Sequence, residues 1–506
     1  NKLQIKTDMK SSIYYLPYRP LELPTGGEAV FDAYVKNPSQ LTEYTIETAF
    51  VEETADRNAQ YERFVHRTYT QLPDDIRRLK EAGYYDAAIA RIDACLAEDW
   101  TASQNQPLHP QGALPVNPTP HGVDAWRQGL LAHREILRRL PQDYTLTAEQ
   151  LLNRLQATLR DFTAEEFAAL DAAGQMDWRF VEGQKRYIYR AAETLVATHP
   201  DLAARQLNAP VPERSWDRFE PQHDQMVRTG AVSADITLRT SIGMTDETFA
   251  RALAAAKAEG RDTVHVKVWL PLPAACPAQS NITLDSFTVQ PTYIAPETAP
   301  QRTAYWEADL AENCRFGAQY SYRSTAHYAA LELHADPVQP DFDTAEQLPH
   351  IAFTPYMKAL AAQLTEGITD PVQKAKRIYD FVTLNVHYHF QPMYFVHENI
   401  TDNCARSRRG DCGVMAATFI TLCRIAGIPA KWQSGMVARP ETAGCHDWAM
   451  FYIAPKGWMY ADCSAGASMA RAGNEKMRLH YFGNLDTDRM VANSDICAPF
   501  DPPMCS

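Results

Sequence analysis

The hydrophobic period changes twice along this chain of 506 residues, and each change limits the fold. Up to about residue 225, apolar residues recur every three to four positions, as amphipathic helices require. From about 226 to 335 they alternate with polar residues, which is typical of half-buried strands. A helical pattern returns from Thr354. At roughly 100–200 residues per domain, the sequence predicts a helical N-terminal domain (1–225), an antiparallel β-sandwich (226–335) and a domain of mixed helices and strands (336–506).

Caps and stop signals predict individual helices in the N-terminal part. Thr147 and Thr163 are each followed three residues later by Gln or Glu, the pattern of a capping box at a helix start. Gly83 separates two short predicted helices, and a longer amphipathic helix is expected over 181–197. At least five helices at short spacing indicate a bundle or a short solenoid, and no fixed-period repeat decides between them.

The middle part is predicted to consist of strands between two linkers. Residues 264–270 alternate valine or leucine with His265, Lys267 and Trp269, as a half-buried strand does. Polar, proline-bearing segments at 210–221 and 337–340 are the predicted linkers. One helix is expected near 245–257, and further short strands are expected over 234–240, 281–289, 302–307 and 317–322.

Composition and charge argue against several classes of protein. With 49 Lys and Arg against 62 Asp and Glu, the net charge is −13, which disfavours a general nucleic-acid binder. No apolar run approaches the roughly 20 residues of a membrane helix. Ten cysteines are too few for a disulfide scaffold, and the absence of a CxxC pair argues against a thiolate zinc site. We therefore expect no nucleic-acid or membrane partner, and a reduced, cytoplasmic location.

One cysteine occupies a position suited to nucleophilic chemistry. A helix is predicted over 412–426, with Asp411 as its N-cap and Gly427 as its left-handed C-cap. Cys412 therefore lies in the first turn, where unpaired N–H groups and the helix dipole favour negative charge. We expect its thiol to ionise more readily than a free thiol of pKa about 8.5. The same N–H groups could stabilise an oxyanion, although a cysteine in an apolar helix is more often structural.

Two residues further along supply the partners that a thiolate nucleophile needs. His446 begins a predicted strand, and Asp462 lies on the next predicted strand, 458–463, after a turn at 455–457. A hairpin would place both residues on neighbouring strands. A thiol, an imidazole base and an acid that orients the base form a catalytic triad. Asp447 is an alternative orienter, although it points to the opposite face of its strand.

Neighbours of these residues allow two interpretations each. Cys445 and Cys463 flank two triad members, so they could form a disulfide across the hairpin or be adjacent by coincidence. Arg406, Arg408 and Arg409 precede the nucleophile and form either a solvated loop or a binding site for a substrate carboxylate.

Taken in order, these elements give the segment from about Pro371 to Cys463 a specific likeness to a known family. The matching elements are 410–412, the helix running on to 424–430, 446–448, and 457–462. The segment resembles the transglutaminase-like superfamily of papain-like folds. The preceding residues 225–335 are similar to the β-domain that often comes before this core in bacterial members.

The resemblance implies a role for each site residue. Cys412 would be the nucleophile, His446 the general base and acid, and Asp462 the residue that orients the imidazole. The family also uses a side chain ahead of the cysteine as a second oxyanion donor, for which Tyr388 is the candidate. The alternatives for that donor are its neighbours His387, His389 and Gln391.

The implied protein is a bacterial enzyme with a papain-like α+β core and no need of a metal or organic cofactor. We expect a cysteine-dependent amide hydrolase, a peptidase or amidase, that acts on peptide or protein substrates through a thioester acyl-enzyme. A transglutaminase that cross-links or deamidates glutamine is the alternative, although nothing resembles the calcium-binding loops of animal cross-linking enzymes. A second alternative is a non-catalytic binding or scaffold protein.

Overall fold

The computed structural model describes residues 2–3, 21–22, 72–97, 120–207, 215–330, 338–397, 399–439, 443–496, 498 and 500–502. Much of the predicted helical domain, notably 23–71 and 98–119, therefore lies outside the described residues. The chain forms two compact units. The first comprises Asn1–Pro212, Glu346–Ala359 and Val386–Val414, and the second comprises Glu213–Ala345, Leu360–Asn385 and Met415–Ser506. The three predicted domain boundaries stay a prediction.

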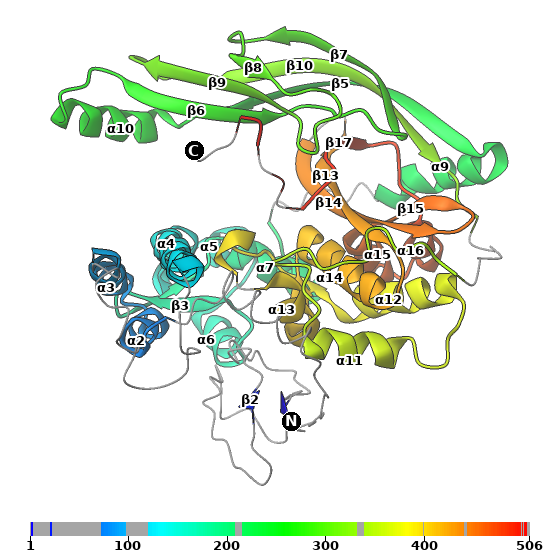
Figure 1. The fold of residues 1–506 in the computed structure, drawn as a ribbon, viewed down its shortest axis with the longest axis horizontal. Coiled ribbons are helices and arrows are strands. Elements are labelled where there is room, and N and C mark those ends of the chain that lie inside the picture. The colour runs from blue at the N-terminus through cyan, green and yellow to red at the C-terminus, as the bar shows by residue number, and fades with distance from the viewer. Residues whose placement is uncertain are drawn as a thin grey trace. The chain divides into compact units, whose positions relative to one another are not determined.

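The first unit is mainly helical (Figure 1). Its elements include α2 (Asp74–Ala82), α3 (Tyr85–Ala97), α4 (Pro120–Asp143), α5 (Ala148–Thr158), α6 (Ala164–Ala172), α7 (Ala191–Thr198), α8 (Pro200–Ala203), η2 (Tyr394–Val396) and α13 (Ile400–Ser407). Thr147 and Thr163 both form the predicted capping boxes at the starts of α5 and α6. Gly83 caps α2 with a φ of 80°. Buried aliphatic residues of these helices form one core, among them Ile92, Leu137, Leu155 and Leu195.

The predicted helix over 181–197 is wrong. Strands β3 (Trp178–Val181) and β4 (Gln184–Tyr187) form an antiparallel hairpin there, and only α7 is helical. The two residues between the strands, Glu182 and Gly183, have positive φ values of 47° and 73°, as a tight hairpin turn requires. Apolar residues at helical spacing across this segment therefore led to the prediction of a helix at a point where the chain reverses direction. Two short pairs complete the strands of this unit: β1 (Lys2–Leu3) with β2 (Leu21–Glu22), and β11 (His387–Tyr388) with β12 (Arg409–Gly410).

The second unit begins with helix α9 (Ser215–Thr229), which is followed by two antiparallel sheets of three strands. One sheet has the order β5-β10-β7, from β5 (Ala231–Ile242), β10 (Phe316–His327) and β7 (Gln279–Phe287). The other has the order β6-β9-β8, from β6 (Val264–Pro271), β9 (Thr303–Leu310) and β8 (Tyr293–Ile294). The predicted strand at 264–270 and the predicted helix, α10 (Asp246–Ala258), are confirmed. The predicted linker at 210–221 is wrong in its second half, because helix α9 (Ser215–Thr229) contains Pro221.

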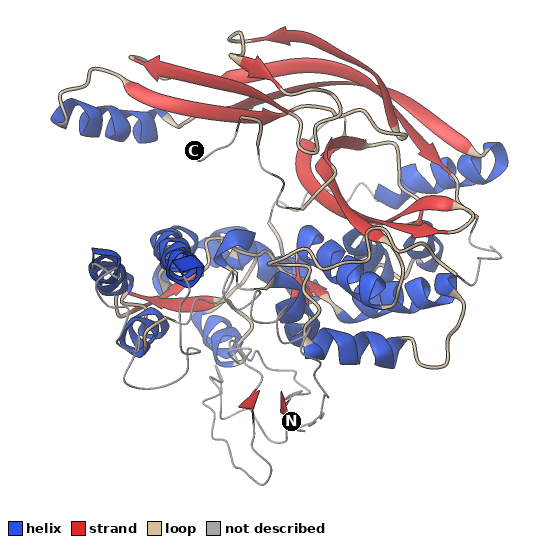
Figure 2. Ribbon diagram, in the orientation of Figure 1, coloured by secondary structure: helices blue, strands red, loops and turns tan. Residues whose placement is uncertain are grey.

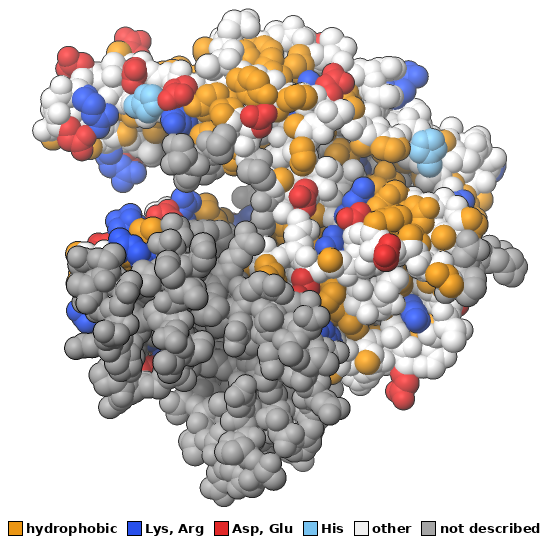
Figure 3. All heavy atoms as spheres, in the orientation of Figure 1, with side chains coloured by type: hydrophobic (Ala, Val, Ile, Leu, Met, Phe, Trp, Pro, Cys, Tyr) orange, Lys and Arg blue, Asp and Glu red, His pale blue; other side chains and the backbone are white. Residues whose placement is uncertain are grey.

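Buried side chains of both sheets share one apolar cluster. Trp306 of β9 and Tyr320 of β10 belong to it, together with Met490 and Ala492 of β17 (Arg489–Asn493). Other apolar residues of these strands, such as Leu238, are only partly buried. Figure 3 shows hydrophobic side chains gathered on the visible face over these strands. Through β17, this core is continuous with the remaining sheet of the unit.

That remaining sheet is antiparallel and has the order β16-β15-β14-β13-β17. Its other strands are β13 (Ala430–Ala438), β14 (Ala443–Ile453), β15 (Gly457–Ala461) and β16 (Phe482–Gly483). Helices α12 (Pro371–Asn385), α15 (Cys463–Arg471) and α16 (Glu475–His480) lie along one side of it (Figure 2). Rings of Tyr379, Phe419, Phe451 and Phe482 stack or meet edge to edge between these layers.

Two boundaries between the units in the sequence fall inside helices, namely α11 (Pro355–Leu364) and α14 (Cys412–Ile425). The predicted end of α14 is confirmed, because Gly427 has a φ of 79° and donates to the Arg424 carbonyl at 3.1 Å. Within the described ranges, no helix is both long and apolar enough to cross a membrane.

Candidate active site

Cys412 is the first residue of α14, as the sequence predicts. Asp411 caps the helix, because its Oδ1 accepts the Val414 N–H at 3.1 Å. The same oxygen accepts the Tyr394 hydroxyl at 2.6 Å. Burial raises the pKa of Asp411, although these hydrogen bonds act in the opposite direction. The Cys412 side chain is half-buried and lies in the turn where the helix dipole favours a negative charge.

Tyr388 lies beside Cys412 because a short parallel strand pair holds it there. The His387 N–H donates to the Arg408 carbonyl at 2.8 Å, and the His389 N–H donates to the Gly410 carbonyl at 3.0 Å. The Tyr388 hydroxyl forms a hydrogen bond with the Cys412 side chain, and burial, followed by the charges of Cys412 and Asp411, raises the pKa of Tyr388. Tyr388 therefore stays protonated and can donate, as an oxyanion donor must. That role stays a prediction.

Two of the alternative donors make hydrogen bonds within their own loop. The Gln391 amide donates to the His389 carbonyl at 3.0 Å, and His389 Nδ1 lies 2.9 Å from the Phe390 carbonyl. His389 is buried. Tyr388 is a candidate donor with a contact to Cys412.

Gly410, two residues before Cys412, is tightly packed. A Cβ at Gly410 would lie 2.8 Å from Val414 Cγ1 and 3.2 Å from Cys404 Sγ. Both distances are shorter than ordinary van der Waals contact. A larger residue at Gly410 would require Val414, in the first turn of α14, or Cys404 to shift.

His446 and Asp462 are brought together in the second unit, as predicted. His446 lies on β14 opposite Gly435 of β13, and its Nε2 is 2.7 Å from Asp462 Oδ2. The predicted hairpin of β14 and β15 forms, with Ala449 opposite Ala461. A neutral imidazole that donates from Nε2 keeps its lone pair on Nδ1, so Nδ1 is the nitrogen able to take a proton.

The predicted strand position of Asp462 is wrong. Strand β15 ends at Ala461, and Asp462 is the N-cap of α15. Its Oδ1 accepts the Ala465 N–H at 2.9 Å and the Ser464 hydroxyl at 3.1 Å, which leaves Oδ2 for His446. Because a cap is fixed by the following helix, the carboxylate is held more firmly than a strand side chain would be.

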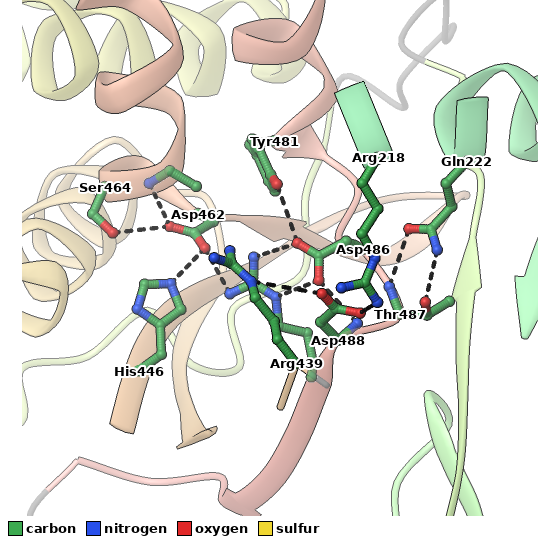
Figure 4. A network of polar contacts seen from close by, with 12 residues as sticks. Arg218, Gln222, Arg439, His446, Asp462, Ser464, Tyr481, Asp486, Thr487 and Asp488 are labelled. Carbon is green, nitrogen blue, oxygen red and sulfur yellow. Dashed lines mark hydrogen bonds and ion pairs between the residues drawn. The ribbon is translucent and has the colours of Figure 1, made fainter. Parts of the chain in front are cut away.

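A buried ionic network surrounds the carboxylate (Figure 4). Asp462 has no exposed side-chain surface, and its Oδ2 forms an ion pair with Arg489 Nη1 at 2.8 Å. Arg489 also pairs with Asp486 at 2.7 Å. Burial alone would raise the pKa of Asp462, but the charges of His446 and Arg489, with the hydrogen bonds, lower it well below its ordinary value. The carboxylate is therefore ionised throughout the physiological pH range.

Arg489 and Asp486 were not predicted from the sequence. Both lie outside the segment that carries the family likeness, and no local spacing links them to Asp462. The available signal was a charged run, Asp486 to Arg489, directly before an apolar strand. A buried strand that begins with charged residues requires them to be paired.

Two of the other predicted neighbours, Cys445 and Arg406, have defined surroundings, and a role for Arg408 and Arg409 in binding a substrate carboxylate stays a prediction. Cys445 is an exposed free thiol, so it forms no disulfide with Cys463. Arg406 pairs with Asp402 at 2.6 Å and lies over the Tyr356 ring at 4.1 Å, which favours a structural role over a substrate site. Within the part of the chain that the structure describes, no group of three or more His, Cys, Asp or Glu side chains is placed to hold a metal ion.

The predicted site therefore falls into two local arrangements. Cys412 and Tyr388 lie together in the first unit, and His446 and Asp462 lie together in the second. The pairing of Cys412 with His446 stays a prediction.

Comparison with known proteins bears on the segment that contains all of these residues. Residues 358–463 match the transglutaminase-like superfamily. The resemblance seen in the sequence is thereby confirmed over this segment. The described part of the chain is a mixed α/β protein with several antiparallel sheets, and the matched segment includes Cys412, His446 and Asp462.

Two solved structures are similar to this chain at low identity. A candidate cysteine protease from Cytophaga hutchinsonii is 17% identical with a TM-score of 0.34, and the match covers 46% of this chain and 78% of that chain. The periplasmic domain of TgpA from Pseudomonas aeruginosa is 14% identical with a TM-score of 0.25, and the match covers 43% of this chain and 74% of that chain. A search of curated proteins found no match.

Proposed function

We propose that this protein is a cysteine-dependent enzyme that hydrolyses an amide bond in a peptide or protein. Cys412 is the nucleophile, His446 the proton carrier and Asp462 the residue that orients the imidazole. Tyr388 and the N–H groups of the first turn of α14 stabilise the oxyanion. Water is the acceptor of the acyl group.

The proposed reaction has two halves. The Cys412 thiolate attacks the carbonyl carbon, a sulfur–carbon bond forms, and the electron pair of the C=O bond moves to oxygen. The oxyanion then collapses, the carbon–nitrogen bond breaks, and the His446 imidazolium gives its proton to the leaving amine. In the second half His446 takes a proton from water, the resulting hydroxide adds to the thioester, and the carbon–sulfur bond breaks to release the acid.

The observation that carries the proposal is the hydrogen bond between His446 Nε2 and Asp462 Oδ2. It is 2.7 Å long, and the carboxylate is completely buried. A buried, ionised carboxylate that accepts the Nε2 proton of a neutral imidazole fixes its tautomer and leaves Nδ1 able to take a proton from a thiol. A binding module has no need of that arrangement, which argues against the scaffold alternative.

A labelling experiment tests whether Cys412 is an activated nucleophile. The full chain is treated with iodoacetamide at about pH 6, where ordinary thiols are mostly protonated, and the modified peptides are quantified by mass spectrometry. Cys445 is the internal reference, because it is an exposed free thiol. We expect Cys412 to be modified at least about tenfold faster than Cys445, and His446→Ala to abolish the difference. Equal rates in the native protein would refute the proposal.

A second experiment identifies the acyl acceptor. A peptide library is incubated with the protein, with and without a primary amine, and Cys412→Ala is the matched control. Shorter peptides that depend on Cys412 support hydrolysis. Addition of the amine with loss of ammonia would instead establish acyl transfer, and identical spectra for both proteins would exclude either activity.

A further inference from the structure

Arg489 lies against the carboxylate that orients His446, although it follows that carboxylate by 27 residues and lies outside the family-matched segment. Its Nη1 is 2.8 Å from Asp462 Oδ2, the same oxygen that accepts from His446. The Arg489 side chain is only 6% exposed. A guanidinium buried to this extent must have a fixed set of partners, because an unpaired buried charge costs several kcal/mol.

Those partners hold the guanidinium in one orientation. Asp486 accepts from Arg489 at 3.1 Å with Oδ1 and at 2.7 Å with Oδ2, a two-point contact that matches the geometry of the guanidinium. The Arg489 carbon Cζ also lies 5.4 Å from the centre of the Trp448 ring and 5.9 Å from that of Tyr481. The ring of Trp448 neighbours that of His446, with centroids 6.0 Å apart.

The strand that carries Arg489 is itself anchored to the sheets formed by residues 231–327. The buried Gln279 side chain of β7 donates to the Val491 carbonyl at 2.8 Å and accepts the Val491 N–H at 2.9 Å. The Arg302 N–H, at the start of β9, donates to the Ala492 carbonyl at 2.9 Å. These bonds join β17 to those sheets at Val491 and Ala492, and Arg489 pairs with Val437 of β13. The position of Arg489 therefore depends both on β13 and on strands outside the family-matched segment.

We propose that Arg489, on a strand bonded to the sheets of residues 231–327, is a positioning residue that holds the Asp462 carboxylate towards His446. This inference rests on the proposed function of Cys412, His446 and Asp462. It adds a residue and a structural dependence that the family-matched segment does not contain.

Several ionisable groups face Asp462. These groups are His446 of β14, Arg489 of β17, Tyr379 of α12, and Tyr481 and Asp486 in the segment after α15. Burial raises the pKa of both tyrosines, so they are uncharged, and Asp486 is an anion. Arg489 is therefore the permanent cation of the set, since a guanidinium does not lose its proton in proteins. Without it, burial and the charge of Asp486 would raise the pKa of Asp462.

The test measures the pH profile of Cys412 alkylation by iodoacetamide in Arg489→Met and Arg489→Lys. We expect the acidic limb of the profile to move to higher pH by about one unit or more in Arg489→Met, because protonated Asp462 no longer stabilises the imidazolium. Arg489→Lys keeps the charge and should move the limb less than half as far. Arg218→Met is the matched control, because Arg218 pairs with Asp488 at 2.8 Å and should leave the limb in place.

The outcomes separate this inference from the proposed function. If native Cys412 reacts no faster than Cys445, the proposed function fails. If native Cys412 is reactive and loses its reactivity in His446→Ala, but Arg489→Met keeps the native pH profile, this inference alone is overturned. An equal loss at all pH values in Arg489→Met and Arg489→Lys also overturns it, because a merely structural role would have that effect. If Arg489→Met does not fold, Arg489→Gln decides in its place: the limb should move in the same direction, and an unchanged limb refutes the inference.

Discussion

Asp488 is part of the network in Figure 4, and its replacement by asparagine gives a quantitative test of the electrostatics behind the candidate site. Its side chain is 2% exposed, and Arg218 lies 2.8 Å away on one side. Burial, followed by the charge of Asp486, raises the pKa of Asp488 from 3.8 to about 6, despite the opposing charges of Arg218 and Arg439. The fold therefore binds a proton at Asp488 more tightly than the unfolded chain does.

The sign and size of the effect follow from linkage. Because the folded pKa is raised, the ionised form costs stability at neutral pH, and the cost disappears as the pH falls through about 6 towards 3.8. One pKa unit corresponds to about 1.4 kcal/mol, so the cost is about 3 kcal/mol at about pH 7.5 and about 1 kcal/mol at about pH 4.5. Asp488→Asn removes the charge at constant size. We expect it to raise the free energy of unfolding by these amounts.

Urea denaturation followed by tryptophan fluorescence measures the difference at both pH values. Asp235→Asn is the control, since Asp235 is an exposed carboxylate paired with Arg323 at 2.7 Å, and the pairing lowers its pKa. That variant should not be stabilised. The reasoning is refuted if Asp488→Asn is no more stable than the native protein at about pH 7.5, or if its gain does not shrink at about pH 4.5.

Three further predictions concern the sheet, a helix cap and a buried histidine. Gly435→Ala would put a Cβ against the Met490 carbonyl oxygen, so we expect it to lower the free energy of unfolding by about 3 kcal/mol or more. Gly444→Ala is the control, because a Cβ there meets nothing within 4 Å. Equal urea midpoints for the two variants would contradict this prediction. Thr163→Ala removes the capping box of α6 and should lower the stability of that helix by about 1 kcal/mol. Amide hydrogen exchange in α6 should become faster, and unchanged exchange would argue against the prediction. Burial lowers the pKa of His480 to about 4, so the native protein should lose stability as the pH falls from 6.5 to about 4. His480→Asn should give a flatter stability curve over that range, and an equally steep curve would exclude the explanation.

The features that were predicted correctly depend on residues close together in the sequence. The caps at Thr147 and Thr163 involve residues three positions apart, and the stop at Gly427 requires only a left-handed residue after the helix. Asp411 and Cys412 are of the same kind, because a cap and the first turn behind it are defined by neighbouring backbone groups. Such features depend little on the tertiary fold of the rest of the chain.

The errors arose where two local patterns competed. Residues 181–197 carry apolar side chains at helical spacing, yet the turn at Glu182 and Gly183 reverses the chain, and the hairpin prevails. Asp462 follows an alternating strand pattern, yet its ability to cap α15 ends the strand at Ala461, two residues before the predicted end. Turn and cap chemistry therefore outweighed periodicity in both places. The expected peptide substrates and the expected cytoplasmic location stay predictions.

The contacts of Asp462 show why a sequence motif describes only part of such a site. The oxygen that faces His446 comes within reach because α15 is capped, and that is a local property of the motif. The countercharge at Arg489 is different, because its position depends on how β17 pairs with β13 and bonds to Gln279. Burial by itself raises the pKa of a carboxylate. A buried carboxylate therefore stays ionised, and can orient an imidazole as an anion, only if a cation offsets the effect of burial. The cation need not come from any fixed place in the sequence, and here it comes from a strand held in place by the sheets of residues 231–327.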